Sequence, residues 1–289
     1  MFRRIYNSLR KAKKSISRKM KKIVPIYVPV LQNELLKDRK AIITGGTKGI
    51  GYEIAKSFLN SGANVIITGR NEETIDNAVK KLIKETNCEG NVFGVVLNNL
   101  DLSTFQKVFD ECVKKVGMID ILVNNAGVNK GEPYGKITQE NYDNTLNTNL
   151  RGTFMLSQIV SNYMRDNKIK GNILNICSSS SLRPAITPYT LSKWGLRGLT
   201  LGLAKTLAPY DIIVNGLAPG PTATEMLIND GYDGIEREQS PLGRFATAIE
   251  IANMAVILVS DMARMTTGDI IYMTGGGGTF TFDDINYTF

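Results

Sequence analysis

The chain has 289 residues, of which 43% are hydrophobic and 21% charged, a composition typical of a globular protein with one sizeable core. Histidine is absent, which excludes a Ser-His-Asp triad, a Cys-His pair and any histidine-ligated metal site. The three cysteines are scattered and form no CxxC pair, which favours a reducing compartment over a disulfide framework, so we expect a cytoplasmic protein.

The net charge of +8 is concentrated at the amino terminus. Residues 1–22 hold ten Lys or Arg and no acid, whereas the rest of the chain holds 25 basic and 27 acidic residues. Apolar residues recur among the basic ones at three- and four-residue steps, which is typical of a helix lying on an anionic membrane surface. A solvated extension and a mitochondrial transit peptide are the alternatives. Because the body is near neutral, the sequence disfavours a nucleic-acid partner.

A short apolar stretch, Ile23–Leu31, follows the basic segment. Pro25 and Pro29 interrupt it, and it is too short to span a bilayer, so we predict neither a secretory signal nor a membrane span. We therefore divide the chain into a basic arm and linker, residues 1–36, and one domain, residues 37–289.

A glycine-rich turn joins the first strand and the first helix of the domain. Residues 41–44 predict a strand, 52–60 a helix and 64–68 a second strand, and the turn reads Gly45-Gly46-Thr47-Lys48-Gly49-Ile50-Gly51. Glycines permit a tight turn and a close backbone approach, and the helix amino terminus offers free N–H groups to a pyrophosphate. The spacing differs from the usual Gly-x-Gly-x-x-Gly, and an ordinary strand–turn–helix corner is the alternative. We predict a dinucleotide site.

The end of the second strand indicates which dinucleotide binds. An acid at this place usually holds a free ribose 2′-hydroxyl, but here the position is Gly69 and the next residue is Arg70. Lys48 adds a second cation from the glycine-rich turn. Two cations without a carboxylate favour a 2′-phosphate, so we predict NADP(H), with two solvated surface charges as the alternative.

The alternation of strand and helix patterns continues through the chain. Further strands are predicted at 91–96, 119–123, 172–176, 212–215 and 270–273, with helices between them. About seven strands with intervening helices predict a single doubly wound parallel α/β sheet of the Rossmann type. The apolar tail, with Phe280, Phe282, Tyr287 and Phe289, predicts packing on a partner subunit or on its own core.

Tyr189 and Lys193 stand four residues apart in a predicted helix, which places both side chains on one face, one turn apart. An ammonium beside a phenol favours the phenolate and prepares the phenol to pass a proton. Alone the pair is a weak signal, because a core-facing tyrosine followed by a solvated lysine gives the same pattern.

Together these segments resemble the short-chain dehydrogenase/reductase family over roughly residues 37–276. The segments that match are Thr44–Gly51, Asn124–Gly127, Asn149, Ser178, Tyr189 with Lys193, and Pro219-Gly220. Each is weak alone, but they occur in the order of the family and on its elements. Residues 241–245 and 274–276 resemble the branch that includes 3-oxoacyl-ACP reductases and glucose dehydrogenases.

The resemblance implies an NADP(H)-dependent oxidoreductase that transfers hydride between NADPH and a carbonyl or secondary alcohol. It implies that Tyr189 donates the proton and that Ser178 hydrogen-bonds the same substrate oxygen. Lys193 would support the tyrosine and hold the nicotinamide ribose, and Asn149 would anchor a water that connects the lysine to solvent. The family often forms homotetramers or homodimers.

The resemblance also implies which residues border the cofactor. These are Gly45, Thr47, Lys48, Gly49, Ile50, Gly51, Arg70, Asp101, Leu102, Asn125, Ala126, Gly127, Tyr189, Lys193, Pro219, Gly220 and Thr222. Within this set, Asp101 and Leu102 would flank the adenine, and the last three would border the nicotinamide. No metal is expected.

One departure from the family concerns the spacing between Ser178 and Tyr189, which is shorter than is common in the branch. Ser179 and Ser180 are therefore alternatives for the catalytic serine, although Ser178 directly follows the strand. Residues 223–240, which are expected to cover the substrate, have a mixed composition that selects no class. A 3-oxoacyl thioester is the first expectation, and a sugar, polyol or small ketone the second. A non-catalytic NADP-binding or membrane-associated scaffold is the alternative of a different class.

Overall fold

The computed structural model describes residues 34–224, 235 and 240–278. By its contacts the chain divides into two units, Met1–Leu31 and Gln32–Phe289, and the described residues all belong to the second. The predicted membrane-binding arm, most of residues 223–240 and the apolar tail lie outside the described residues. Leu36 is fully buried in the core of this unit. Within the described ranges, no helix has the length and hydrophobicity needed to cross a membrane.

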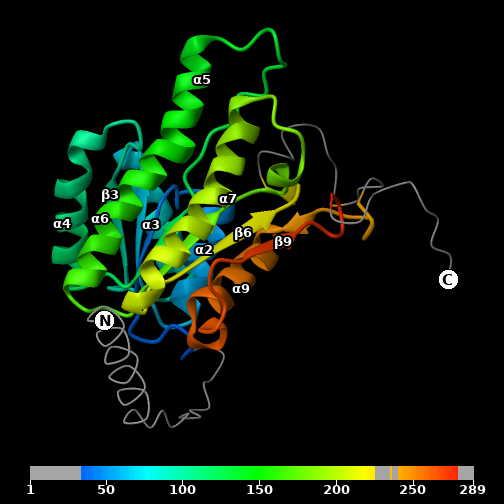
Figure 1. Ribbon diagram of the computed structural model, residues 1–289. Coiled ribbons are helices and arrows are strands. Elements are labelled where there is room, and N and C mark those ends of the chain that lie inside the picture. The colour runs from blue at the N-terminus through cyan, green and yellow to red at the C-terminus, as the bar shows by residue number, and fades with distance from the viewer. Residues whose placement is uncertain (1–33, 225–234, 236–239, 279–289) are drawn as a thin grey trace, which may run out of the picture. The chain divides into compact units, whose positions relative to one another are not determined.

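Seven parallel strands form the central sheet, which confirms the predicted doubly wound architecture (Figure 1). In spatial order they are β3 (Val92–Val96), β2 (Asn64–Gly69), β1 (Lys40–Ile43), β4 (Ile121–Asn124), β5 (Asn172–Ile176), β6 (Ile213–Pro219) and β9 (Ile270–Met273). The chain moves outward in one direction from β1 and in the other from β4, so the topological switch point lies between these two strands. A short parallel pair, β7 (Thr222–Ala223) with β8 (Ala246–Thr247), was not predicted.

Helices cover both faces of the sheet, as parallel strands require (Figure 1). One face packs against α2 (Gly49–Asn60), α3 (Glu72–Thr86) and α9 (Ala248–Val259), and the other against α4 (Phe105–Val116), α6 (Gly152–Asp166) and α7 (Pro188–Leu207). Successive strand residues point to opposite faces, so Ile42 packs in one core and Ile43 in the other. Two separate apolar cores therefore hold the carboxyl ends of the strands in one row.

The helical stretch between β4 and β5 is not a single regular α-helix. It begins as α5 (Gln139–Leu146), passes through a π-helical turn, η3 (Asn147–Arg151), and continues as α6. Asn149 lies in the π turn and is 2% exposed. A π turn inserts an extra residue into the helical ladder and is frequent at functional sites. Here it turns a polar side chain toward the interior.

Capping boxes fix where α7 and α9 begin. Thr187 and Thr190 cap each other's backbone at the start of α7, and Pro188 occupies its first turn. Thr247 and Glu250 do the same for α9. The guanidinium of Arg244 beside Glu250, together with the hydrogen bonds from Thr247, lowers the pKa of that carboxyl to about 2.

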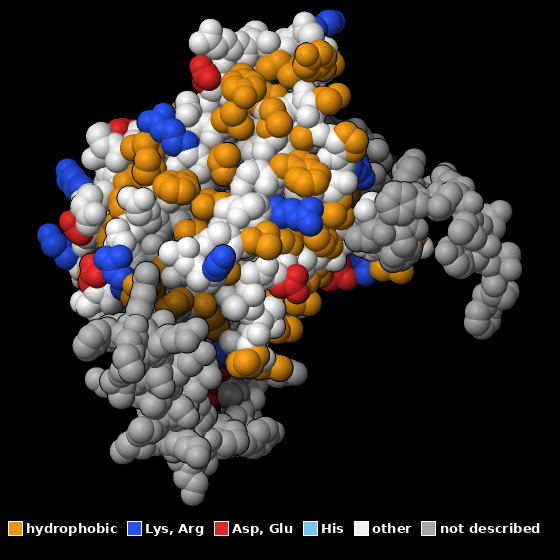
Figure 2. All heavy atoms as spheres, viewed as in Figure 1, with side chains coloured by type: hydrophobic (Ala, Val, Ile, Leu, Met, Phe, Trp, Pro, Cys, Tyr) orange, Lys and Arg blue, Asp and Glu red, His pale blue; other side chains and the backbone are white. Residues whose placement is uncertain are grey.

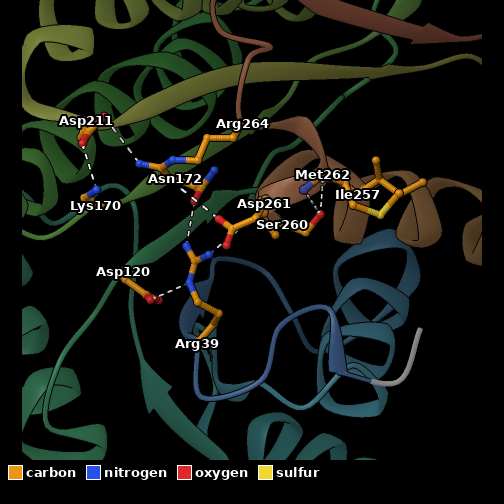
Figure 3. A network of polar contacts seen from close by, with 11 residues as sticks. Arg39, Asp120, Lys170, Asn172, Asp211, Ile257, Ser260, Asp261, Met262 and Arg264 are labelled. Carbon is orange, nitrogen blue, oxygen red and sulfur yellow. Dashed lines mark hydrogen bonds and ion pairs between the residues drawn. The ribbon is translucent and has the colours of Figure 1, made fainter. Parts of the chain in front are cut away.

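A polar network closes the amino-terminal edge of the sheet, opposite the strand ends that face ligands (Figure 3). Arg39 Nε donates to Asp120 Oδ2 at 2.6 Å, and its Nη2 donates to Asn172 Oδ1 at 2.7 Å. The other oxygen of Asp120 accepts the backbone N–H of Lys40 at 2.8 Å. One guanidinium therefore ties together the starts of β1, β4 and β5.

We predict that Arg39→Met destabilises the domain by about 3 kcal/mol, because it strands a carboxylate that is only 7% exposed. Lys37→Met is the matched control, because it breaks a pair with Glu34 whose side chains are 61% and 41% exposed, worth less than about 1 kcal/mol. Urea unfolding of the full chain measures both. Equal losses of unfolding free energy in the two variants would contradict the stabilising role of the buried Arg39–Asp120 pair.

Candidate active site

Helix α7 carries Tyr189 and Lys193 side by side at the carboxyl end of β5. Tyr189 is half-buried, Lys193 is 5% exposed, and the lysine Nζ lies 5.6 Å from the centre of the phenol ring. The same Nζ donates to the backbone oxygen of Ile176, the last residue of β5, at 2.8 Å. That bond uses one of the three ammonium protons and leaves two for other acceptors. A buried ammonium with unused donors is suited to hold the hydroxyls of a ligand.

Ser178 follows β5 and is 8% exposed. Its Oγ accepts the backbone N–H of Ser180 at 3.1 Å and caps the 3₁₀ helix η4 (Ser179–Leu182). Because the hydroxyl is the acceptor in this bond, its own proton is available to a substrate oxygen. The two alternative serines, Ser179 and Ser180, lie within η4 itself.

Asn149 connects the loop after β4 to α7. Its Nδ2 donates to the oxygen of Val128 at 2.9 Å and to Ser192 Oγ at 3.1 Å, and its Oδ1 accepts from Val128 N at 2.8 Å. Ser192 Oγ in turn donates to the oxygen of Tyr189 at 2.7 Å. Both amide protons of Asn149 are therefore engaged, one with the loop after β4 and one with α7. Sequence reasoning missed Ser192 because a serine inside a helix gives no signal of its own.

A buried polar network lies beneath these residues. Asn124 Nδ2 donates to Ser157 Oγ at 2.9 Å and to Asn175 Oδ1 at 2.8 Å, and Asn175 Nδ2 donates to Thr200 Oγ1 at 2.9 Å. These side chains come from β4, β5, α6 and α7 and are all nearly inaccessible to solvent. Among the described residues Asn124 Oδ1 has no hydrogen-bond partner, so the network is not fully satisfied, and its three bonds are what join these four elements.

The glycine-rich turn after β1 packs closely against Asn125 and leads into the uncapped start of α2. Gly45 and Gly49 have positive φ angles of 64° and 57°, which favour glycine. A Cβ on Gly51 would lie 2.4 Å from Asn125 Nδ2, the atom that donates to the backbone oxygens of Thr44 and Gly45. Lys48 caps α2 without a side-chain hydrogen bond, so the first N–H groups of this helix remain open to an anion.

Gly69 ends β2 directly beside this turn. The backbone N–H of Gly46 donates to the oxygen of Thr68 at 3.1 Å, and a Cβ on Gly69 would lie 3.0 Å from the methyl group of Thr47. A carboxylate at position 69 would therefore be crowded. Lys48 and Arg70, both exposed, are the cations that flank this junction.

The loop after β3 carries the two residues that were predicted to flank the adenine. Asp101 accepts from the N–H and the hydroxyl of Ser103 and caps the 3₁₀ helix η2 (Leu102–Thr104), and Leu102 packs against the core on the α4 side. Both side chains therefore have contacts within the protein. Asn98 and Asn99 lie closer to the end of β3, and Asn99 is 7% exposed. The apolar pattern placed the end of this strand at Val96, as the structure has it, but no motif singled out the two asparagines.

The last predicted cofactor segment follows β6. Gly220 N donates to the oxygen of Met273 at 2.9 Å, and a Cβ on Gly220 would lie 3.0 Å from the Cα of Thr274. Thr222 Oγ1 donates back to the oxygen of Gly220 at 3.0 Å. Glycine is therefore required for the ends of β6 and β9 to approach each other here.

A small cavity lies beside Tyr189, between the loop after β4 and α5. The side chains that border it include Asn129, Lys130, Glu132, Asn141, Thr145 and Thr187. The nearest cysteine in sequence to the catalytic candidates, Cys177, is buried, and burial raises the pKa of its thiol to about 11. It therefore remains protonated near neutral pH.

The predicted catalytic residues therefore meet at one edge of the sheet. Tyr189 and Lys193 come from α7, Ser178 from the end of β5, and Asn149 from the π turn that contacts α7. The glycine-rich turn and the loops after β2, β4 and β6 lie at the same carboxyl edge. This edge, with its open helix terminus and close backbone approaches, suits a dinucleotide.

Comparison with known proteins agrees with this geometry. Residues 45–277 match the family model described as enoyl-(acyl carrier protein) reductase. The 3-oxoacyl-(acyl-carrier-protein) reductase FabG of Aquifex aeolicus is 34% identical, with 83% of this chain and 98% of that protein covered. Gluconate 5-dehydrogenase of Gluconobacter oxydans is 31% identical, with coverages of 83% and 95%. A crystal structure of a short chain dehydrogenase from Bacillus anthracis superposes with a TM-score of 0.77 at 31% identity, covering 86% of this chain and 99% of that one. The chain belongs to the short-chain dehydrogenase/reductase family.

Proposed function

We propose that the protein is an NADP(H)-dependent oxidoreductase that reduces a carbonyl to a secondary alcohol, with Tyr189 as the proton donor. The observation that carries the proposal is the placement of this phenol 5.6 Å from a buried ammonium, at the end of the strand that leads into Ser178. Membership of the family supports an oxidoreductase over a non-catalytic scaffold.

The bound cofactor supplies the hydride, and the side chains of the chain manage the substrate oxygen. Tyr189 O–H donates its proton to the oxygen that becomes the alkoxide. Ser178 O–H donates a hydrogen bond to the same oxygen, which orients the carbonyl and stabilises the developing charge. Lys193 stabilises the phenolate that remains and has donors left for the nicotinamide ribose. The water that Asn149 was predicted to anchor would return a proton to the site.

The rest of the carboxyl edge is proposed to hold the cofactor. The open N–H groups of α2 suit the pyrophosphate, and the close approach at Gly220 suits the flat nicotinamide ring. Asn125 to Gly127 would border the adjoining ribose, and Ile50 with Gly51 the phosphates. For the adenine, Asn98 and Asn99 fit better than Asp101 and Leu102, because they lie closer to the end of β3.

The first candidate for the substrate is a 3-oxoacyl thioester, because several similar proteins are named as 3-oxoacyl-(acyl-carrier-protein) reductases. A hydroxylated ketone, such as a keto sugar, is the second candidate. It is supported by similarity to proteins named gluconate 5-dehydrogenase and L-xylulose reductase. NADPH oxidation with acetoacetyl thioesters and with keto sugars compares the two, and the higher kcat/KM identifies the class.

We predict that Tyr189→Phe lowers kcat by roughly 10²–10⁴-fold, because the general acid is lost while the ring that packs in the site remains. The dissociation constant for NADPH, measured by fluorescence titration, stays within about twofold, because the phenol proton is not a main cofactor contact. Tyr210→Phe, at a tyrosine that is 50% exposed, controls for loss of a phenol elsewhere. Turnover of Tyr189→Phe near that of the wild type would refute the assigned role.

We predict that Arg70→Asp weakens NADPH binding by roughly 10- to 100-fold, because a charge-assisted contact to the 2′-phosphate is replaced by repulsion. NADH binding, in which this phosphate is absent, changes much less. Lys107→Asp makes the same change in net charge at an exposed site on α4 and controls for long-range effects. An unchanged ratio of the two affinities would overturn the assignment of NADP(H).

A homo-oligomer is proposed from the surface of α6 and α7. Figure 2, viewed as Figure 1, shows hydrophobic side chains on the face that includes these helices, and exposed residues there are Phe154, Met155, Leu191, Trp194 and Leu201. Gly198 and Gly202 on α7 have open space where a Cβ would stand, which permits close approach of another helix. Sedimentation velocity at micromolar concentration tests for a dimer or tetramer, and a monomer would contradict it.

Contact of residues 1–22 with an anionic membrane is proposed from the sequence alone. Ten basic residues without an acid give this segment an electrostatic attraction that the near-neutral remainder lacks. Co-sedimentation with phosphatidylserine vesicles, with and without residues 1–22, tests it. Equal sedimentation of the two chains would contradict the proposal.

A further inference from the structure

The segment between Ser178 and Tyr189 is held by several hydrogen bonds. After Ser178 the chain forms η4, in which the fully buried Ser181 donates through Oγ to the oxygen of Ser178 at 2.8 Å. The same Oγ lies 3.4 Å from the hydroxyl of Tyr272 on β9. The backbone position of Ser178 thus depends on where Ser181 is held.

Two side chains of α7 reach back to this loop. Trp194 Nε1 donates to the backbone oxygen of Arg183 at 2.8 Å, and Arg197 Nη1 donates to the backbone oxygen of Ser181 at 3.2 Å. The guanidinium of Arg197 lies 5.4 Å from the Trp194 ring, so the two also support each other through a cation–π contact. We call Trp194 and Arg197 the α7 clasp.

The clasp belongs to the same helix as Tyr189 and Lys193. Lys193 holds α7 against the end of β5 through Ile176, and Trp194, the next residue, holds the loop that leaves that strand. A helix is stiff over this length, whereas a loop is not. The contacts therefore couple the serine and the tyrosine to a single rigid element.

We propose that Trp194 and Arg197 are positioning residues that fix Ser178 relative to Tyr189, so that both hydroxyls reach one substrate oxygen. The proposal rests on the proposed function, in which the two side chains share that oxygen. Reactions that depend on such alignment lose about 10²-fold when a group is misplaced by roughly 1 Å. Both side chains donate to backbone oxygens of the loop, so each acts through the backbone of the serine loop.

Two features set this role apart from mere stabilisation of the fold. Both side chains donate to backbone oxygens of the loop and not to side chains of the core. Arg197 binds the residue whose hydroxyl supports Ser178. If the two residues only stabilised the fold, their loss would affect folding whether or not Ser178 is present. If they position Ser178, their loss lowers turnover only while Ser178 is present.

The test is a double-mutant cycle measured by single-turnover NADPH oxidation. Trp194→Phe keeps an aromatic ring but removes the N–H donor, and Arg197→Ala removes the other donor. We expect each to lower the rate roughly tenfold, which corresponds to loss of one hydrogen bond to the backbone. The dissociation constant for NADPH stays within twofold. Lys205→Ala, at an exposed basic residue of α7, leaves the rate unchanged.

The decisive comparison repeats these changes in a Ser178→Ala background. If the clasp acts through Ser178, its loss lowers the remaining rate less than twofold there, because the group to be positioned is already absent. An undiminished tenfold loss in that background would overturn the proposal. Arg197→Lys, which keeps a donor, restores part of the rate if the hydrogen bond is what matters.

Hydrogen exchange of the amides at residues 179–183 gives a readout that does not need activity. The clasp variants should exchange these amides at least tenfold faster, while the amides of α7 remain as protected as in the wild type. Unchanged exchange in the loop would also overturn the proposal. A wild-type chain without turnover on any carbonyl contradicts the proposed function instead, and the exchange data still decide whether the clasp holds the loop.

Discussion

The hydrogen bond from Lys193 Nζ to the backbone oxygen of Ile176 is the contact on which the site depends. It joins helix α7 to the end of a central strand, in a place where the ammonium is almost fully buried. Burying a charge is costly unless it is hydrogen-bonded, and the strand carbonyl provides one such bond. The two remaining N–H groups of the ammonium are then available to bind a ligand, because a buried cation with unused protons favours oxygen ligands.

The parallel sheet makes this arrangement effective. All seven strands end at the same edge, so loops that are far apart in sequence contribute to one surface. The glycine-rich turn after β1 and the loop after β4 are joined there by Asn125 and Thr44. At the opposite edge, Arg39 joins the starts of three of the strands. Stability and function therefore occupy opposite ends of the same strands.

Much of this arrangement could be predicted from the sequence. Periodic apolar runs located all seven strands, and the spacing of Tyr189 and Lys193 placed them on one helical face, where the structure has them. These signals are local, since they depend on the 2.0 and 3.6 periodicities of single elements. The family resemblance then selected among the many pairs that share such spacing.

What could not be predicted depends on contacts between elements. The π turn at Asn147–Arg151 follows from tertiary hydrogen bonds of Asn149 to Val128 and Ser192, which leave no mark in the local pattern. Asp101, which the resemblance implied would flank the adenine, also caps the 3₁₀ helix η2, a contact that the family pattern does not indicate. The α7 clasp was equally hidden, because an exposed tryptophan and an arginine on a helix ordinarily indicate only a surface.

The central claim is that hydride and proton reach one carbonyl at this edge of the sheet. It is tested most directly by turnover with NADPH that carries deuterium at the reactive carbon of the nicotinamide. The account predicts that the deuterium appears on the carbon bearing the new hydroxyl of the product, in ordinary water. Product formed without that label would contradict it.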